Sequence, residues 1–187
     1  MAVKIKIEYR NKLKNLKEYV VLATVDAKRY QEANIALIKE LTNVQKTPGV
    51  YVTLNKPYAT VEGLFKKKGI NTDLIIFIDA VTKTAGGKTE KTNDCLYIGN
   101  PENLSDISLA MDQAVTSLPS KDRFVFFDSL NTLLIYNSLS TVAKFIHFIA
   151  SKMRVWKVKG IIISLEKRAH EELINELSQF CDVHFEL

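Results

Sequence analysis

The segment Ala85-Gly86-Gly87-Lys88-Thr89 ends in the same three letters as a phosphate-binding P-loop. A P-loop reads G-x-x-x-x-G-K-[ST], follows a strand and opens a helix, so that backbone N–H groups surround the phosphates. Here the first glycine of the motif would fall on a threonine, and residues 90–98 run into another strand-like segment. We therefore expect the two glycines to form a turn, with Lys88 and Thr89 in solvent.

Aspartates lie at the ends of three apolar, strand-like runs. Asp26 follows YVVLATV, Asp79 lies near the end of LIIFIDA, and Asp128 lies near the end of RFVFFDS. The carboxyl ends of parallel strands share one edge of a sheet, where three carboxylates could hold a cation. Aspartates that form turns leave the same pattern, and we favour that interpretation, so no metal is expected. Asn55 and Glu166 hold the same position after two further strands.

The histidines and cysteines lack the spacing of a reactive or metal-binding site. His147, His170 and His184 have no second ligand three or four residues away, so packing or surface roles are expected. Cys95 and Cys181 lie in apolar contexts and are predicted to be buried free thiols. The chain also lacks the G-x-S-x-G and G-x-G-x-x-G motifs, and no cofactor is expected.

The positive charge of the chain is modest and partly clustered. Its net charge of +5 permits contact with nucleic acid but is small for a dedicated nucleic-acid-binding protein. A solvated basic surface is the favoured interpretation, with Trp156 packed at the end of its helix. In the alternative, Trp156 stacks on a base beside phosphate-binding cations. The candidate cations form two clusters, Lys66, Lys67 and Lys68, and Arg154, Lys157 and Lys159.

Strand-length apolar runs alternate with segments of helical period. Strands are expected at 19–25, 50–54, 74–80, 95–100, 123–129, 160–165 and 183–187, and helices at 31–42, 60–68, from 103 or 104, at 141–153 after an N-cap at Ser140, and at 168–180. This alternation predicts an α/β fold with a mostly parallel, doubly wound sheet and helices on both faces. With 47% hydrophobic residues, 7 glycines and 4 prolines, residues 1–187 are expected to form a single domain.

Two patterns that direct a chain to membranes are missing. No apolar run approaches the ~18 residues that a membrane span requires. Charged residues interrupt the apolar ones near the N-terminus, unlike the apolar core of a signal peptide. We expect a cytoplasmic protein that does not contact a membrane.

Four segments in sequence order carry a resemblance to a known family. VYVTLNKPY, LIIFIDAVTK, NPENLSDISLAMDQA and FVFFDSLNTLLIYNS resemble the KaiC-like branch of the RecA-type ATPases, especially its archaeal members. The resemblance extends from about Tyr19 to the C-terminus and implies the RecA-like three-layer α/β/α architecture. The run ending in Asp128 and Ser129 resembles the Walker B strand, whose aspartate holds Mg²⁺ in active relatives.

The same resemblance locates where nucleotide chemistry would be found. An ungapped alignment of the first strand and its helix puts DAKRYQEA, residues 26–33, in the P-loop slot, which contains no glycine. The positions of the motif's first glycine, its lysine and its hydroxyl residue hold Asp26, Glu32 and Ala33. Lys28 and Arg29 are the cations of this slot. Where active relatives carry an acidic base after the second strand, this chain has Asn55 and Lys56.

These departures predict a protein that is not an enzyme. Without the glycines and the lysine, N–H groups cannot easily converge on a phosphate, and without the base no water is activated. The expected role is a regulatory or protein-interaction module that works with a protein partner or as a homo-oligomer. Two alternatives remain: a relative that binds nucleic acid, and a nucleotide-binding protein with atypical phosphate contacts.

Overall fold

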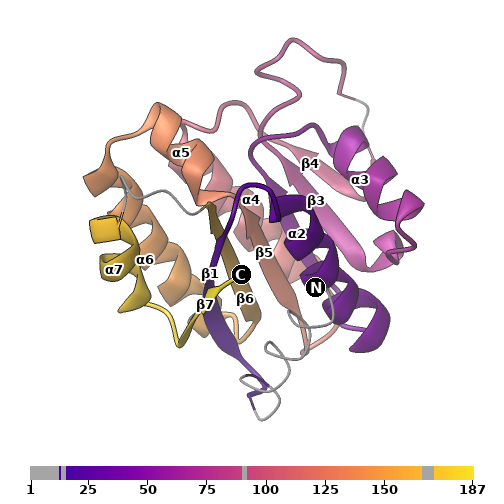
Figure 1. Ribbon diagram of the computed structural model, residues 1–187. Helices are drawn as coiled ribbons and strands as arrows, with labels where there is room; N and C mark the ends of the chain where they lie inside the picture. The colour runs from indigo at the N-terminus through magenta and orange to yellow at the C-terminus, as the bar shows by residue number, and fades with distance from the viewer. Residues whose placement is uncertain (1–12, 14–15, 90–91, 166–170) are drawn as a thin grey trace.

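The computed structural model describes residue 13 and residues 16–89, 92–165 and 171–187 (Figure 1). The strands are β1 (Tyr19–Val25), β2 (Gly49–Thr53), β3 (Ile75–Asp79), β4 (Cys95–Tyr97), β5 (Phe124–Asp128), β6 (Lys159–Leu165) and β7 (Val183–Glu186). The described α-helices are α2 (Tyr30–Lys39), α3 (Tyr58–Lys67), α4 (Leu104–Ser117), α5 (Leu130–Tyr136), α6 (Leu139–Val155) and α7 (Glu171–Ser178).

The strands form one sheet in the order β4-β3-β2-β5-β6-β1-β7, and every described strand pair is parallel. α2 and α3 pack on one face, and α4, α5, α6 and α7 pack on the other (Figure 1). These three layers confirm the predicted α/β fold with a parallel, doubly wound sheet. They also create two hydrophobic cores, one on each face of the sheet.

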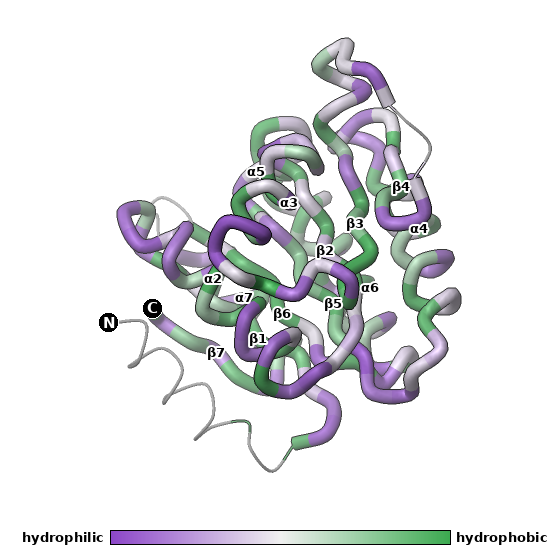
Figure 2. Tube along the Cα trace, turned by 90° about the vertical axis from the view of Figure 1, so that its right-hand side faces the viewer, coloured by the Kyte–Doolittle hydropathy of each residue, from purple (hydrophilic) through white to green (hydrophobic). Residues whose placement is uncertain are grey.

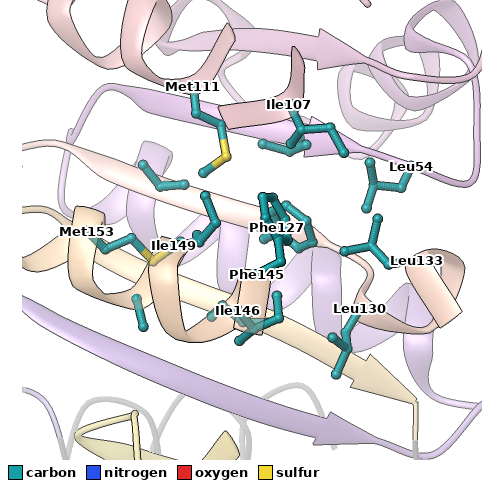
Figure 3. Close-up of a cluster of buried hydrophobic side chains, with 14 of the residues drawn as sticks. Leu54, Ile107, Met111, Phe127, Leu130, Leu133, Phe145, Ile146, Ile149 and Met153 are labelled. Atoms are coloured by element: carbon teal, nitrogen blue, oxygen red, sulfur yellow. The ribbon is translucent and has the colours of Figure 1, made fainter. Parts of the chain in front are cut away.

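The central strand β5 contributes side chains to both cores. Phe126 packs toward α2 and α3, whereas Phe127 packs toward α4 and α6. Successive side chains of a strand point to opposite faces, which is why a continuous apolar run is needed here. Figure 3 shows the second core, where Phe127 lies among Ile107 and Met111 of α4 and Phe145 of α6.

The AGGKT segment lies in the loop between β3 and β4, which projects from the carboxyl edge of the sheet (Figure 1). The N–H of Gly87 donates to the carbonyl of Thr82 at 2.9 Å, and Gly86 has a φ of 72°. Lys88 and Thr89 are exposed. Figure 2 shows near-neutral and hydrophilic residues in this loop, in contrast with the hydrophobic strand β3. The predicted turn is confirmed, and the next described element is a strand.

The start of α6 differs from the expected position. The helix begins at Leu139, and the side chain of Ser138 caps it by accepting a hydrogen bond from the N–H of Thr141 at 3.2 Å. Ser140, the expected N-cap, lies inside the first turn. Two serines flank Leu139, and the earlier one is the cap because its side chain accepts from one of the free N–H groups of the first helical turn.

Helix α5 is not predicted from the sequence. Its buried positions are Leu130 and Leu133, but it has only 7 residues, which are too few to show a helical period in the sequence. The expected positions Glu166 and His170 lie outside the described residues, as does the beginning of the helix expected at 168–180. In the part of the chain that is described, no helix has both the length and the apolar character needed to cross a membrane.

Candidate functional site

The carboxyl ends of β2 and β5 lie side by side at the centre of the sheet. The chain leaves β2 toward α3 on one face and leaves β5 toward α5 and α6 on the other face. In open α/β sheets, ligands bind in the crevice that forms at such a switch in direction. The structure therefore brings Asn55 and Asp128 to the position where a site is expected.

Asp128 is the centre of a hydrogen-bond network at this position. The hydroxyl of Tyr30 donates to Oδ1 of Asp128, and the hydroxyl of Tyr51 donates to Oδ2. The side-chain amide of Asn55 donates to the hydroxyl oxygen of Tyr30 at 2.6 Å. Nδ2 of Asn34 lies 3.5 Å from the hydroxyl oxygen of Tyr51. We call these five residues the Asp128 network.

Two elements position the hydroxyl donors. Tyr30 and Asn34 are the first and fifth residues of α2, and side chains four residues apart share one face of a helix. Tyr51 lies in the middle of β2 and pairs in register with Phe126 of β5. The two rings stack with centroids 5.1 Å apart and an interplanar angle of 10°. This packing fixes the direction of the Tyr51 hydroxyl.

Burial governs the protonation of the network. Asp128 is 3% exposed, and burial raises the pKa of its carboxyl above the usual range, although the hydrogen bonds from Tyr30 and Tyr51 oppose this effect. Burial and the adjacent Asp128 carboxylate raise the pKa of both tyrosines, so their hydroxyls stay protonated and donate. The cavity beside the network has a volume of about 20 Å³. It has room for about one water molecule.

The raised pKa of Asp128 makes stability depend on pH. A carboxyl whose pKa is higher in the folded chain binds its proton more tightly when folded, so the free energy of unfolding grows as pH falls through that pKa. We expect the wild type to gain stability relative to Asp128→Asn as pH falls from neutrality toward about 3.9, the ordinary aspartate pKa. Urea unfolding of both proteins measures this difference, and a pH-independent difference would contradict the raised pKa.

The turn that aligns with the P-loop spans only residues 26–29, between β1 and α2. Three of its four backbone N–H groups donate hydrogen bonds within the protein. The N–H of Asp26 donates to the carbonyl of Leu187 at 3.1 Å, and the N–H of Arg29 donates to the carbonyl of Asp26 at 2.9 Å. The N–H of Lys28 donates to Oδ1 of Asp26 at 2.7 Å. These donors are therefore not arranged as a ring around an anion.

The other aligned positions also lack phosphate-binding character. Glu32 is exposed on α2, and Ala33 is fully buried in the core beneath that helix. Ser129 is 1% exposed and precedes α5, and the peptide bond that joins it to Asp128 is cis. Lys56 lines the small cavity beside the network.

The Mg²⁺–nucleotide that the family resemblance implies does not fit these residues. Mg²⁺ needs carboxylate and phosphate oxygens in an open octahedral site. Both carboxylate oxygens of Asp128 accept tyrosine hydroxyls, and Asn55, at the position of the base, donates to one of those hydroxyls. The residual volume of about 20 Å³ is far below the several hundred that ligand pockets occupy.

The other two candidate carboxylates form turns. Asp79 is fully buried and accepts from the N–H groups of Tyr58 and Val81, each at 2.7 Å. Asp26 accepts from the turn that follows it. In the sheet, β2 separates β3 from β5, and β6 separates β5 from β1. Among the described residues, no three potential metal ligands form a group.

The described histidines and the cysteines make packing or hydrogen-bond contacts within the fold. His147 stacks on a phenylalanine ring with centroids 4.3 Å apart, and Nε2 of His184 lies 2.7 Å from a threonine hydroxyl. Both thiols are free. Cys95 is buried as predicted, whereas Cys181 is partly exposed. Burial raises the pKa of each thiol to about 12, which leaves them protonated at neutral pH.

Several residues of the basic clusters form ion pairs or hydrogen bonds with other residues of this chain. Trp156 follows α6 as its C-cap residue and packs against the core at the end of the helix, as expected, and its Nε1 donates to Asp112 at 3.0 Å. Lys67, Lys68 and Lys157 are exposed. Ion pairs join Lys66 to Glu62 at 2.9 Å, Arg154 to Asp182 at 3.0 Å and Lys159 to Asp122 at 2.9 Å.

Sequence reasoning misses Tyr30, Asn34 and Tyr51. Tyr30 is the aromatic residue of the slot at 26–33, and Tyr51 carries a hydroxyl into the apolar run VYVTL. A buried tyrosine hydroxyl needs an acceptor, so each pointed to a polar group elsewhere in the fold. The sequence does not say which one.

Several solved structures share the fold of this protein. It resembles a KaiC-like protein, PH0186, from the hyperthermophilic archaeon Pyrococcus horikoshii, with a TM-score of 0.57 and 13% identity over 79% of this chain and 61% of that chain. It therefore spans less than two thirds of that protein. It also resembles an uncharacterised protein of that organism, PH0321, solved in complex with an unknown peptide, with a TM-score of 0.69 and 10% identity over 97% of this chain and 83% of that chain.

A third structure from Pyrococcus horikoshii, PH0250, matches with a TM-score of 0.63 and 14% identity over 97% of this chain and 86% of that chain. At these identities the likeness establishes the fold alone, a RecA-like three-layer α/β/α arrangement that this chain shares with the KaiC-like protein. Residues 21–187 match a family of unknown function, DUF7504, and the chain belongs to this family. No curated protein matches its sequence.

Proposed function

We propose that this chain is a non-catalytic KaiC-like domain that acts as a regulatory or protein-interaction module. The observation that carries the proposal is the position of the Tyr30 hydroxyl. It donates to Asp128, the Walker B-like carboxylate, and accepts from Asn55, the residue at the position of the base. A protein hydroxyl thus joins the two groups between which a nucleotide's terminal phosphate and its metal would have to lie.

The β1–α2 turn supports the same proposal. A nucleotide would require Tyr30 to leave Asp128, and its phosphates would have to displace the internal hydrogen bonds of residues 26–29. The acidic side chains of Asp26 and Glu32 would then repel the phosphates, because like charges close to a protein surface repel by about 4 kcal/mol at 4 Å. Each of these steps opposes binding.

The interaction role is supported by a relative with the same fold. The structure of PH0321 holds an unknown peptide, and this chain covers 83% of that protein. A fold of this type without a nucleotide site retains its surface for binding other proteins. We therefore assign the present chain to protein recognition rather than to hydrolysis.

Thermal unfolding with and without nucleotides tests the proposal. We expect ATP, ADP and GTP, each with and without Mg²⁺, to leave the unfolding temperature unchanged. A ligand at 100 times its dissociation constant adds about 2.7 kcal/mol of stability, so even a weak site would be detected. An ATP-dependent shift that Asp128→Asn abolishes would refute the closed site and favour nucleotide binding with atypical phosphate contacts.

A further inference from the structure

A groove lies between helices α4 and α6 on the face of the sheet opposite α2. It has a volume of about 530 Å³ and includes Leu109 of α4 and Phe148 of α6. Leu109 is 58% exposed and Phe148 is 46% exposed. Large apolar side chains that share one exposed hollow mark binding surfaces more often than isolated ones do. We call this hollow the α4/α6 groove; Leu104, Phe145, Lys144 and Lys152 also line it.

One wall of the groove is held in place by interactions within the protein. Lys152 forms an ion pair with Asp112 at 2.5 Å, and Nε1 of Trp156 donates to the same carboxylate at 3.0 Å. The ammonium of Lys152 also lies 5.8 Å from the ring centroid of Phe148 and 5.4 Å from that of Trp156. A surface that is already ordered loses less conformational entropy when a partner binds.

The charges of the groove select the chemistry of its occupant. Asp112 is neutralised by Lys152, whereas no described acidic side chain lies within ion-pair distance of Lys144. A second copy docked on this groove by a two-fold axis would bring the same patch, and a second Lys144, against it. Repulsion between the copies opposes that arrangement. A partner with acidic side chains would instead be attracted.

The shape of the groove favours a helix. The lining residues of α6 run from Thr141 to Lys152, which corresponds to about 16 Å of helix or three turns. An amphipathic helix can lie between two neighbouring helices and place apolar residues of successive turns into the hollow. Nucleic acid is less suited to this surface, because two lysines, one of them already paired, offer few phosphate contacts.

We propose that the α4/α6 groove binds an amphipathic, acidic helix of a partner protein. Apolar residues of that helix contact Leu109 and Phe148, and a flanking carboxylate pairs with Lys144. This inference rests on the proposed interaction role and adds the surface and the chemistry of the partner. It does not depend on whether the Asp128 network excludes nucleotides.

A displayed library of helical peptides with randomised surface positions tests this inference. The library is selected on the wild-type protein and counter-selected on the double variant Leu109→Ser/Phe148→Ser. We expect enriched peptides to carry apolar residues at positions i, i+3 or i+4, and i+7, with Glu or Asp beside them. Synthetic copies of these peptides are then titrated by fluorescence anisotropy, in the absence of nucleotide.

The affinity of an enriched peptide is expected to fall about tenfold or more in the double variant, which removes both apolar anchors. Lys144→Glu should weaken binding more at low salt than at high salt, because salt screens exposed charges. The matched control is Ile135→Ser, which truncates an exposed residue of α5 outside the groove, and it should leave affinity unchanged. The substituted positions are exposed, and unchanged unfolding temperatures confirm that the variants fold.

Four outcomes overturn the inference: no enrichment, enriched peptides that bind the double variant equally, peptides flanked by lysine instead of acid, or a wild-type dimer that the double variant dissociates. The last outcome would make a second copy the occupant. These results are distinct from those of the nucleotide experiment. Peptide binding together with an ATP-dependent shift in unfolding temperature would refute only the proposal that the Asp128 network excludes nucleotides. No peptide binding and no such shift would refute only the proposed role of the α4/α6 groove.

Discussion

Replacing Tyr30 and Tyr51 together with phenylalanine is expected to lower the free energy of unfolding by about 3–6 kcal/mol. Each hydroxyl donates to the carboxylate of Asp128, which is 3% exposed, and each hydrogen bond to a charged group contributes about 1.5–3 kcal/mol. The double variant leaves this buried carboxylate without both donors, and burial of an unpaired charge is strongly unfavourable.

Urea unfolding measures this loss through the fluorescence of the protein's one tryptophan. Adding Asp128→Leu to the double variant removes the unpaired carboxylate, so we expect the triple variant to recover most of the lost stability. Tyr136→Phe is the matched control, because this tyrosine is 43% exposed and should tolerate the change. A triple variant no more stable than the double variant would mean that the two hydroxyls do not act through Asp128.

Phe127→Ala is expected to cost about 3–5 kcal/mol, the usual range for truncating a buried phenylalanine. Phe127 is fully buried in the core between the sheet and helices α4 and α6 (Figure 3). Its ring centroid lies 6.2 Å from that of Phe145, so the substitution leaves a cavity beneath α6. The cavity cannot be filled easily, because side chains from three elements surround it.

The same urea titration measures the effect of Phe127→Ala. Phe148→Ala is the control, since Phe148 lies on the same helix as Phe145 but is 46% exposed. We expect it to cost about 1 kcal/mol or less, as for most surface substitutions. Equal losses for the two variants would contradict the packing of this core.

The strands were predictable because burial on both faces of a parallel sheet demands continuous apolar runs. The stripe along α6 and the buried position of Phe127 follow from such local patterns. The sequence also shows directly that residues 26–33, which align with the P-loop position, contain no glycine. Short elements and exact helix ends could not be predicted from such patterns. For this reason α5 and the cap at Ser138 are seen only in the structure.

The sequence by itself determined the α/β architecture and the absence of glycine from residues 26–33, since both depend on residues that are neighbours along the chain. Tertiary structure decided which polar groups meet beside this segment. Tyr30 is 98 residues from Asp128 and 25 from Asn55, and their contacts exist because α2 returns over the sheet while the chain passes from β1 to β2. Periodicity reports which face of an element is buried, but strand order decides which distant polar groups meet there. The AGGKT segment lies in an exposed loop. The residue that defines the candidate site is Tyr30, which belongs to no recognisable motif.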